Sequence, residues 1–240
     1  MILDAQNLRV RYRNGALGVL DVSFKVDRGQ IVALFGPNGA GKTTSMRAIS
    51  GFLKTEGAKV VKGRVELFGI DLTNSEPHRM TRHGVAFVPE RRKVFPNMSV
   101  MENLTALGHR PEQAVYDRIF TLFPMLATAR KLAAGRLSGG QRQMLAIARA
   151  LLSEPKLLIV DEMTLGLHHS MHAPLFDAVS EVASEGTAVI LVDESTGFAL
   201  EAADYCYLLS GGRVRDEGPA ERFRGNELLA AGYVEADDRD

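Results

Sequence analysis

Short apolar runs bounded by glycine-rich or polar turns recur along the chain and predict a set of buried β-strands. The run IVALF within residues 30–35 is apolar throughout, which is typical of a central strand with both faces covered. Helical patterns at residues 42–50 and 171–184 alternate with the strands, so we predict an α/β domain with a largely parallel sheet. The predicted strands cover residues 8–12, 18–26, 30–35, 60–68, 85–88, 157–160 and 188–192.

Two segments interrupt this alternation. Residues 60–68 predict a β-rich flank, whereas residues from about 97 to 155 have helical spacing and few β-branched runs. We therefore predict one domain over residues 1–240. Its core and β-rich flank cover about residues 1–90 and 156–240, and a helical subdomain covers about 91–155. The segments YCYLL and RVRDEG, joined by two glycines, predict a closing hairpin.

Composition and charge narrow the possible classes of protein. The chain has 29 basic and 29 acidic residues, so no overall basic field indicates nucleic-acid binding. A single cysteine, Cys206, excludes an internal disulfide and suits a reducing compartment. No signal peptide is recognisable, and no window reaches the roughly 20 apolar residues that a membrane helix needs. We expect a chain that does not cross a bilayer by itself.

The segment GPNGAGKTT at residues 36–44 carries the most specific chemistry. It matches G-x-x-x-x-G-K-[ST], follows a predicted buried strand and precedes a predicted helix. Glycines let successive backbone amides point at phosphate oxygens, and the helix N-terminus adds partial positive charge. We expect Lys42 to reach the outer phosphates and Thr43 to ligate Mg²⁺. The predicted nucleotide-binding residues are Gly36, Pro37, Asn38, Gly39, Ala40, Gly41, Lys42, Thr43 and Thr44.

A second apolar strand, LLIVDE at residues 157–162, ends in two carboxylates. A parallel strand delivers its last residues to the sheet edge where the phosphate loop also lies. Asp161 is therefore placed to hold Mg²⁺, directly or through water, and Glu162 to polarise an attacking water. Together with the phosphate loop, the two carboxylates predict hydrolysis of a nucleoside triphosphate.

The sequence LSGGQ at residues 137–141 stands before a helical segment and shortly upstream of LLIVDE. With these motifs the chain resembles the ABC-transporter ATPase family over nearly its whole length. The resemblance implies a P-loop NTPase core with a mainly parallel sheet, an antiparallel β subdomain and a helical subdomain, and it implies ATP and Mg²⁺ as cofactors. We expect Ser138, Gly139, Gly140 and Gln141 to form a second anion site that completes the nucleotide site of another subunit.

Further positions take their expected roles from this resemblance. Tyr12 stands where the family has an aromatic ring that stacks on adenine. Glu90 stands where most members have a glutamine that senses the γ-phosphate and contacts the permease. Glu194 falls where most members have a histidine that touches the γ-phosphate. Leu165 and Gly166 match a loop that contacts the second subunit of the dimer.

Three features affect the expected chemistry. A carboxylate at Glu194 cannot donate a hydrogen bond to phosphate, and like charges 4 Å apart cost roughly 4 kcal/mol at an effective dielectric near 20. We hypothesise that Glu194 points away, is protonated or slows the site. Met163 replaces a family proline, which predicts a less rigid loop. The charged run at residues 90–93 predicts an exposed loop that either docks a permease or is solvated.

The segments VPERRKVFPNMSVMENL and TLGLHHS are similar to those of LivF-type subunits, which serve branched-chain amino acid uptake. They imply an ATP-hydrolysing subunit that energises import of branched-chain or other hydrophobic amino acids. A urea or amide importer ATPase and a weakly catalytic regulatory subunit are alternatives. An ABC ATPase acting on DNA or ribosomes is disfavoured, because the chain has one cassette and no heptads between the phosphate loop and LSGGQ.

The resemblance also implies the assembly in which the chain works. Its expected partners are membrane permease subunits, a second ABC ATPase in a hetero- or homodimer and, indirectly, a periplasmic or surface solute-binding protein. We expect no nucleic-acid partner. The expected location is cytoplasmic, peripheral on the inner face of the cell membrane. In the implied cycle, two subunits close around ATP and hydrolysis opens them again.

Overall fold

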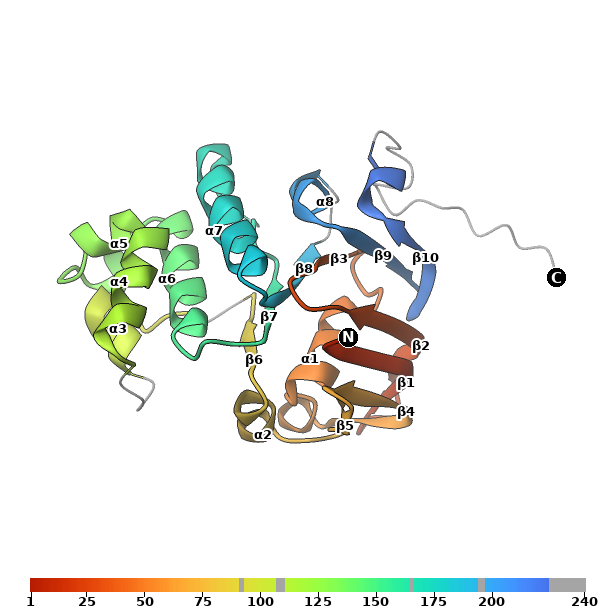
Figure 1. The fold of residues 1–240 in the computed structure, drawn as a ribbon. Coiled ribbons are helices and arrows are strands. Elements are labelled where there is room, and N and C mark those ends of the chain that lie inside the picture. Colours follow the sequence, from red (N-terminus) through yellow and green to blue (C-terminus); the bar gives the residue numbers. More distant parts are fainter. Residues whose placement is uncertain (91–92, 107–110, 165, 194–196, 225–240) are drawn as a thin grey trace.

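A mixed β-sheet forms the centre of the computed structural model, which describes residues 1–90, 93–106, 111–164, 166–193 and 197–224. Within these residues, ten strands pair in the order β5-β4-β1-β2-β10-β9-β3-β8-β7-β6 (Figure 1). The strands are β1 (Leu3–Tyr12), β2 (Leu17–Val26), β3 (Ile31–Phe35), β4 (Ala58–Leu67), β5 (Ile70–Asp71), β6 (Val85–Val88), β7 (Leu157–Asp161), β8 (Ala188–Asp193), β9 (Tyr205–Ser210) and β10 (Arg213–Pro219).

Strand direction divides the sheet into two regions. The strands β9, β3, β8, β7 and β6 pair in parallel and form the core. The strands β1, β2, β4 and β5 pair antiparallel. β10 connects the regions, because it pairs with both β9 and β2. The expected P-loop fold, with a parallel core and an antiparallel β region, is confirmed.

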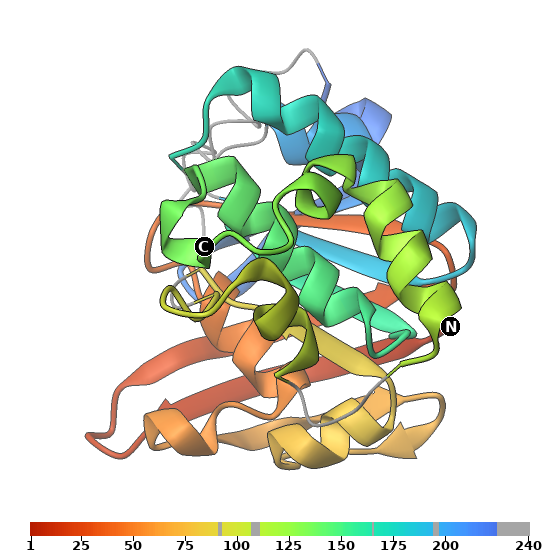
Figure 2. The same ribbon diagram turned by 90° about the vertical axis from the view of Figure 1, so that its left-hand side faces the viewer.

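Helices cover both faces of the parallel region. They are α1 (Lys42–Ser50), α2 (Pro77–Arg82), α3 (Val100–Thr105), α4 (Gln113–Leu122), α5 (Pro124–Thr128), α6 (Gly139–Leu151), α7 (His172–Ser184) and α8 (Gly197–Ala202). Short 3₁₀ turns occur at Lys54–Glu56, Ala134–Arg136, His169–Met171 and Ala220–Arg222. The helices α3 to α6 gather at one side of the sheet, as Figures 1 and 2 both show. None of the described helices is long and apolar enough to span a membrane.

The side chains of β3 show how the sheet separates two apolar layers. Ala33 and Phe35 belong to the cluster that contains α6 and α7, whereas Val32 and Leu34 belong to the cluster that contains α1. All four side chains are buried. Because both faces of β3 are covered, every position needs an apolar residue, which explains the run IVALF. The helices α1 and α6 therefore pack on opposite faces of the sheet.

The predicted elements differ from the structure mainly at their ends. The helix predicted at residues 42–50 has the bounds of α1, and the helix predicted at 171–184 begins one residue later, at His172. β1 extends back to Leu3. β9 and β10 form the predicted hairpin, and both Gly211 and Gly212 have positive φ. The apolar pattern did not predict α2 and α8, which have six residues each and are too short to show a helical period.

Candidate nucleotide site

The segment at residues 36–44 forms a tight loop and the start of α1, directly after β3. Gly36 has a φ of +146°, and a Cβ atom added there would lie 2.0 Å from the carbonyl oxygen of Leu209. Gly41 caps α1 with a φ of +99°, and its added Cβ would lie 2.8 Å from the carbonyl oxygen of Gly18. Glycine alone satisfies these two positions without strain. The loop can therefore curve closely around a ligand at the N-terminus of α1.

Lys42 lies inside this curve. Its side chain is 6% exposed, and Nζ donates hydrogen bonds to the carbonyl oxygens of Gly36 at 2.5 Å and Pro37 at 3.1 Å. A phosphate group bound in the loop would meet this ammonium together with the positive end of α1. The other predicted residues of the segment, Asn38, Gly39, Ala40 and Thr44, occupy the same loop and the first turn of α1.

Tyr12, the last residue of β1, reaches the same helix. Its hydroxyl lies 2.9 Å from Oγ1 of Thr44, so the two hydroxyls share a hydrogen bond. The ring also covers Gly18, since a Cβ added at Gly18 would lie 2.6 Å from Cε2 of Tyr12. The structure thus brings the predicted adenine-stacking ring next to the phosphate loop.

Asp161 ends β7 and is 2% exposed. Its carboxylate accepts a hydrogen bond from the Thr43 side chain, and its Oδ1 atom is buried without a hydrogen-bond partner among the residues that the structure describes. Burial raises the pKa of this carboxyl, and the charge of Glu90 raises it further, whereas the bond from Thr43 opposes the shift. A hydroxyl beside an unsatisfied carboxylate oxygen matches the oxygen ligands that Mg²⁺ prefers. These residues fit a Mg²⁺ ion held between the protein and phosphates.

Glu162 follows in a left-handed backbone conformation with a φ of +50°, which is uncommon for a residue with a Cβ atom. Its amide donates to the carbonyl oxygen of Val192 at 2.9 Å, which holds this conformation against β8. Burial raises the pKa of the Glu162 carboxyl, and the negative charges of Glu90, Asp161 and Asp193 raise it further. The raised pKa makes the carboxylate a better proton acceptor for water.

Glu90 reaches the same place because β6 and β7 pair in parallel. Val88 lies opposite Val160, so the residues that follow the two strands emerge side by side at one edge of the sheet. The charge of Glu90 raises the pKa of both Asp161 and Glu162. The structure therefore brings three predicted site residues into one acidic cluster.

Asp193 is a fourth carboxylate at this edge and was not among the predicted site residues. Asp193 ends β8, is 9% exposed, and accepts a hydrogen bond from Oγ1 of Thr164 at 3.1 Å. It follows the apolar run AVILV in the same way that Asp161 follows LLIV. The signal that identified Asp161, a carboxylate at the end of a buried parallel strand, was therefore available for Asp193 as well.

The prediction of an exposed charged loop at residues 90–93 is wrong for Lys93. Its side chain is half-buried, and the charges of Asp161, Glu162 and Glu90 all act on its ammonium. Nζ donates a hydrogen bond to Oε1 of Gln143 in α6. A run of charges is usually solvated, but here the parallel pairing of β6 and β7 carries Lys93 back to the carboxylates.

The LSGGQ segment forms the start of α6. Oγ of Ser138 accepts a hydrogen bond from the Gln141 amide at 3.2 Å, and the Ser138 amide donates to Oε1 of Gln141 at 2.9 Å. These reciprocal bonds form a capping box. A Cβ added at Gly140 would lie 2.7 Å from the Met171 side chain, and one at Gly139 would lie 3.3 Å from Leu167, so both glycines allow close packing. The segment belongs to α6, on the face of the sheet opposite α1.

Two predicted residues, Leu165 and Glu194, lie outside the described residues, so the hypothesis about Glu194 stays a prediction. The residues on both sides of Leu165 are described. Gly166 has a φ of +70°. Met163 is 3% exposed and belongs to the apolar cluster around α6 and α7. This burial anchors the loop after Glu162 at the position where the family has proline.

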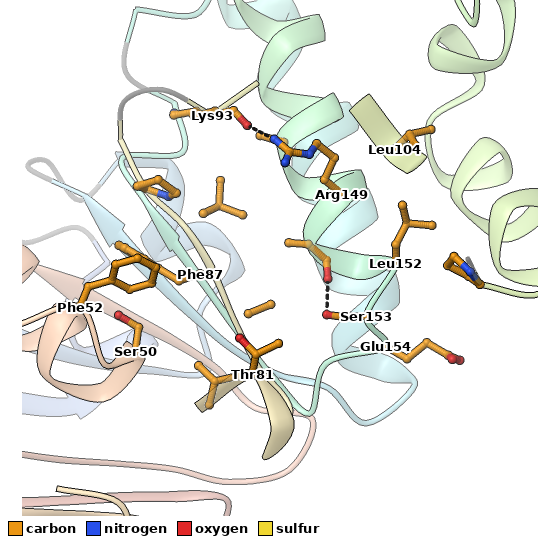
Figure 3. Close-up of a pocket in the computed structure, with 17 residues that line it drawn as sticks. Ser50, Phe52, Thr81, Phe87, Lys93, Leu104, Arg149, Leu152, Ser153 and Glu154 are labelled. Carbon is orange, nitrogen blue, oxygen red and sulfur yellow. Dashed lines mark hydrogen bonds between the residues drawn. The ribbon is translucent and has the colours of Figure 1, made fainter. Parts of the chain in front are cut away.

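A groove of about 530 Å³ opens beside this site (Figure 3). Phe52 and Phe87 lie on one side of it, with ring centroids 5.7 Å apart, and Leu104 and Leu152 lie on the other. Arg149 and Lys93 line its polar end. The groove is therefore mostly apolar, lies between the sheet and the helices around α6, and adjoins the acidic cluster through Lys93.

Comparisons with known proteins decide the family. Residues 19–165 match the sequence pattern described as "ABC transporter". This chain belongs to the ABC transporter family. Within that family it is 38% identical to the high-affinity branched-chain amino acid transport ATP-binding protein BraG of Pseudomonas aeruginosa, over 83% of this chain and 86% of that protein. It is 37% identical to the probable branched-chain amino acid transport ATP-binding protein LivF of Archaeoglobus fulgidus, over 88% and 87% of the two chains.

A solved structure of an ABC cassette has the same fold. The crystal structure of the ADP conformation of an ATP-binding cassette of an ABC transporter matches with a TM-score of 0.82 and 26% identity, over 98% of this chain and 99% of that one. The predicted resemblance to ABC-transporter ATPases is thus confirmed. As a family member with this fold, the chain is an ATP-binding ABC ATPase.

Proposed function

We propose that this chain hydrolyses ATP to energise an importer of branched-chain or other hydrophobic amino acids. The observation that carries the proposal is the gathering of Lys42, Thr43, Asp161 and Glu162 around one sheet edge in an ABC cassette. The solute class rests on the two relatives named for branched-chain amino acid transport, each of which matches more than four-fifths of this chain.

The proposed chemistry assigns one task to each residue. The backbone amides of the loop and Lys42 bind the β- and γ-phosphates, and Tyr12 stacks on adenine. Thr43 and Asp161 hold Mg²⁺, which neutralises charge on the phosphates when it is bound. Glu162 accepts a proton from the attacking water as the water oxygen bonds to the γ-phosphorus and the bond to ADP breaks. Glu90, whose charge acts on Glu162, senses the γ-phosphate.

A second ATPase subunit completes the proposed site. The LSGGQ segment starts α6, whereas the phosphate loop starts α1 on the other face of the sheet. This separation supports the proposal that one chain offers two anion sites, one at Ser138, Gly139, Gly140 and Gln141 and one at the phosphate loop. Two chains in head-to-tail contact, as a hetero- or homodimer, would place one of each on every ATP.

The groove of Figure 3 is the proposed docking site for a membrane permease subunit. Its apolar walls, with Phe52 and Phe87 on one side and Leu104 on the other, suit a segment with apolar side chains. Through this contact the chain would work at the cytoplasmic face of the membrane. A solute-binding protein would act on the permease and not on this chain, and we propose no nucleic-acid partner.

The solute class is tested by uptake. Cells that lose this chain should take up radiolabelled leucine more slowly, and the unmodified chain should restore uptake whereas the Glu162→Gln variant should not. Unchanged leucine uptake together with lost urea uptake would instead identify a urea or amide importer. If the complete complex binds ATP but does not hydrolyse it, the chain is a regulatory subunit. That result is expected if the carboxylate of Glu194 slows hydrolysis.

A further inference from the structure

The strongest unexplained feature of the site is the position of Lys93. This residue follows Glu90 in the loop after β6, and two bonds attach it to α6. Nζ donates to Oε1 of Gln143 at 2.5 Å, and the backbone carbonyl oxygen accepts a hydrogen bond from Nη1 of Arg149 at 2.8 Å (Figure 3 shows the second bond). The loop that carries Glu90 is thus attached to the helix that begins with LSGGQ.

The amide of Gln143 is oriented by this contact. Gln143 is 2% exposed, and its Nε2 atom has no hydrogen-bond partner among the described residues. An ammonium group can only donate, so the amide must turn its oxygen towards Lys93. A buried amide that keeps one donor unsatisfied in order to face an ammonium indicates that the ammonium is held at this point.

Lys93 also faces the acidic cluster. Burial lowers the pKa of its ammonium, and the charges of Asp161, Glu162 and Glu90 oppose that shift. The same carboxylates repel one another, because Glu90 raises the pKa of both Asp161 and Glu162. Lys42 supplies positive charge from the side of the phosphate loop. Lys93 supplies it from the side of α6.

We propose that Lys93 is a positioning residue of the ATPase site: it offsets the negative charge of the acidic cluster and ties the loop that carries Glu90 to α6. This inference rests on the proposed ATP hydrolysis. Lys93 also lines the groove proposed for the permease, so a segment seated there would contact the residue that faces the carboxylates. As a positioning residue it acts through Glu90 and Glu162.

The test compares Lys93→Met, which removes the charge at similar length, with Lys93→Arg, which keeps the charge. The matched control is Lys131→Met, at an exposed lysine beside α5. We expect Lys93→Met to lower kcat by about tenfold or more while the Kd for ATP stays within about twofold, because a positioning contact acts on the reaction and not on ATP binding. Lys93→Arg should keep at least about a third of the wild-type kcat, since it restores the charge. Lys131→Met should match the wild type.

A double variant tests the charge argument itself. Glu90→Gln removes one of the three carboxylates that act on Lys93. The fold-loss caused by Lys93→Met should therefore be smaller in a Glu90→Gln background than in the wild type. An equal fold-loss in both backgrounds would contradict a role in offsetting the cluster.

Hydrogen exchange separates this inference from the proposed function, because it needs no turnover. The Phe95 amide donates to Oδ1 of Asn103 at 2.8 Å, within the segment that Lys93 begins. Exchange of this segment is measured without added nucleotide. Lys93→Met should speed exchange in peptides covering residues 93–105, and Lys93→Arg should not.

The outcomes separate the two proposals. If the wild type hydrolyses ATP, and Lys93→Met has the same kcat and the same exchange as the wild type, the proposed role of Lys93 is wrong and the proposed hydrolysis stands. If the wild type does not hydrolyse ATP, but Lys93→Met exchanges faster than the wild type, the proposed hydrolysis is wrong and the attachment by Lys93 stands. Equal losses and equally lowered Tm in both Lys93 variants would show simple packing and overturn the inference.

Discussion

The Thr43 side chain donates a hydrogen bond to the carboxylate of Asp161. This contact joins the first turn of α1 to the end of β7, two elements more than a hundred residues apart in the sequence. It leaves Oδ1 of Asp161 buried and without a hydrogen-bond partner among the described residues. A divalent cation between the two side chains would satisfy that oxygen, so the geometry links the two ATPase motifs through one proposed metal site.

The phosphate loop predicts a difference between two glycine substitutions. Gly36 and Gly39 both have positive φ, but an added Cβ meets the Leu209 carbonyl oxygen at Gly36 and nothing within 4 Å at Gly39. Gly39→Ala should therefore cost only the strain of the left-handed conformation, about 1–2 kcal/mol of unfolding free energy. Gly36→Ala should cost clearly more, because backbone must also move. Denaturant unfolding of the two variants measures this difference, and equal costs would contradict the described loop.

Tyr12 predicts separate effects for its ring and its hydroxyl. Tyr12→Phe loses the partly buried hydrogen bond to Thr44 but keeps the ring, so its Kd for ATP should stay within about twofold of the wild type, because this bond joins two protein hydroxyls and does not contact adenine. Tyr12→Ala loses the stacking surface, which is worth about 1–3 kcal/mol per base, and should weaken binding roughly tenfold. Equilibrium binding of ATP measures both values. Tight binding by Tyr12→Ala would remove Tyr12 from the adenine site.

The acidic cluster predicts the pH dependence of turnover. Hydrolysis needs ionised Glu162, and burial together with Glu90, Asp161 and Asp193 raises the pKa of Glu162 above its ordinary 4.5. The acid limb of the profile of kcat/KM should therefore lie above pH 4.5. Glu90→Gln removes a like charge, lowers the pKa of Glu162 and should move this limb to lower pH.

The control for this shift is Glu112→Gln, at an exposed residue that precedes α4. This variant should leave the limb in place, because Glu112 is not among the groups that act on Glu162. An acid limb that stays in place in Glu90→Gln would show that Glu90 does not act on Glu162 in solution.

Much of the site could be predicted because its signals are local. The glycines of residues 36–44 are required by the backbone of that same segment, and Asp161 follows directly from the end of an apolar strand. The parallel core could be predicted for the same reason. Both faces of β3 are covered, so every residue of the run IVALF is apolar. In these cases the sequence neighbours of a residue determine its environment.

The acidic cluster could be predicted only in part, because it depends on which strands are neighbours. Nothing in the local pattern indicates that β6 pairs with β7, yet this pairing brings Glu90 to Glu162 and Lys93 to both. From the charged run at residues 90–93 alone, the sequence therefore predicts an exposed loop that either docks a permease or is solvated. Asp193 differs from these residues, because its position at the end of a buried strand carried the same signal as Asp161 and it could have been predicted.

The proposed mechanism is tested most directly by Mg-ATP turnover as a function of protein concentration, for the unmodified chain and its Glu162→Gln variant. We predict turnover that rises more steeply than linearly with concentration, because two subunits complete each site, and that is lost in Glu162→Gln while ATP still binds. If a homodimer is not competent, the same result should appear on adding the second ATPase and the permease. Turnover by Glu162→Gln at the wild-type rate would contradict the assignment of Glu162 as the proton acceptor, and with it the proposed mechanism.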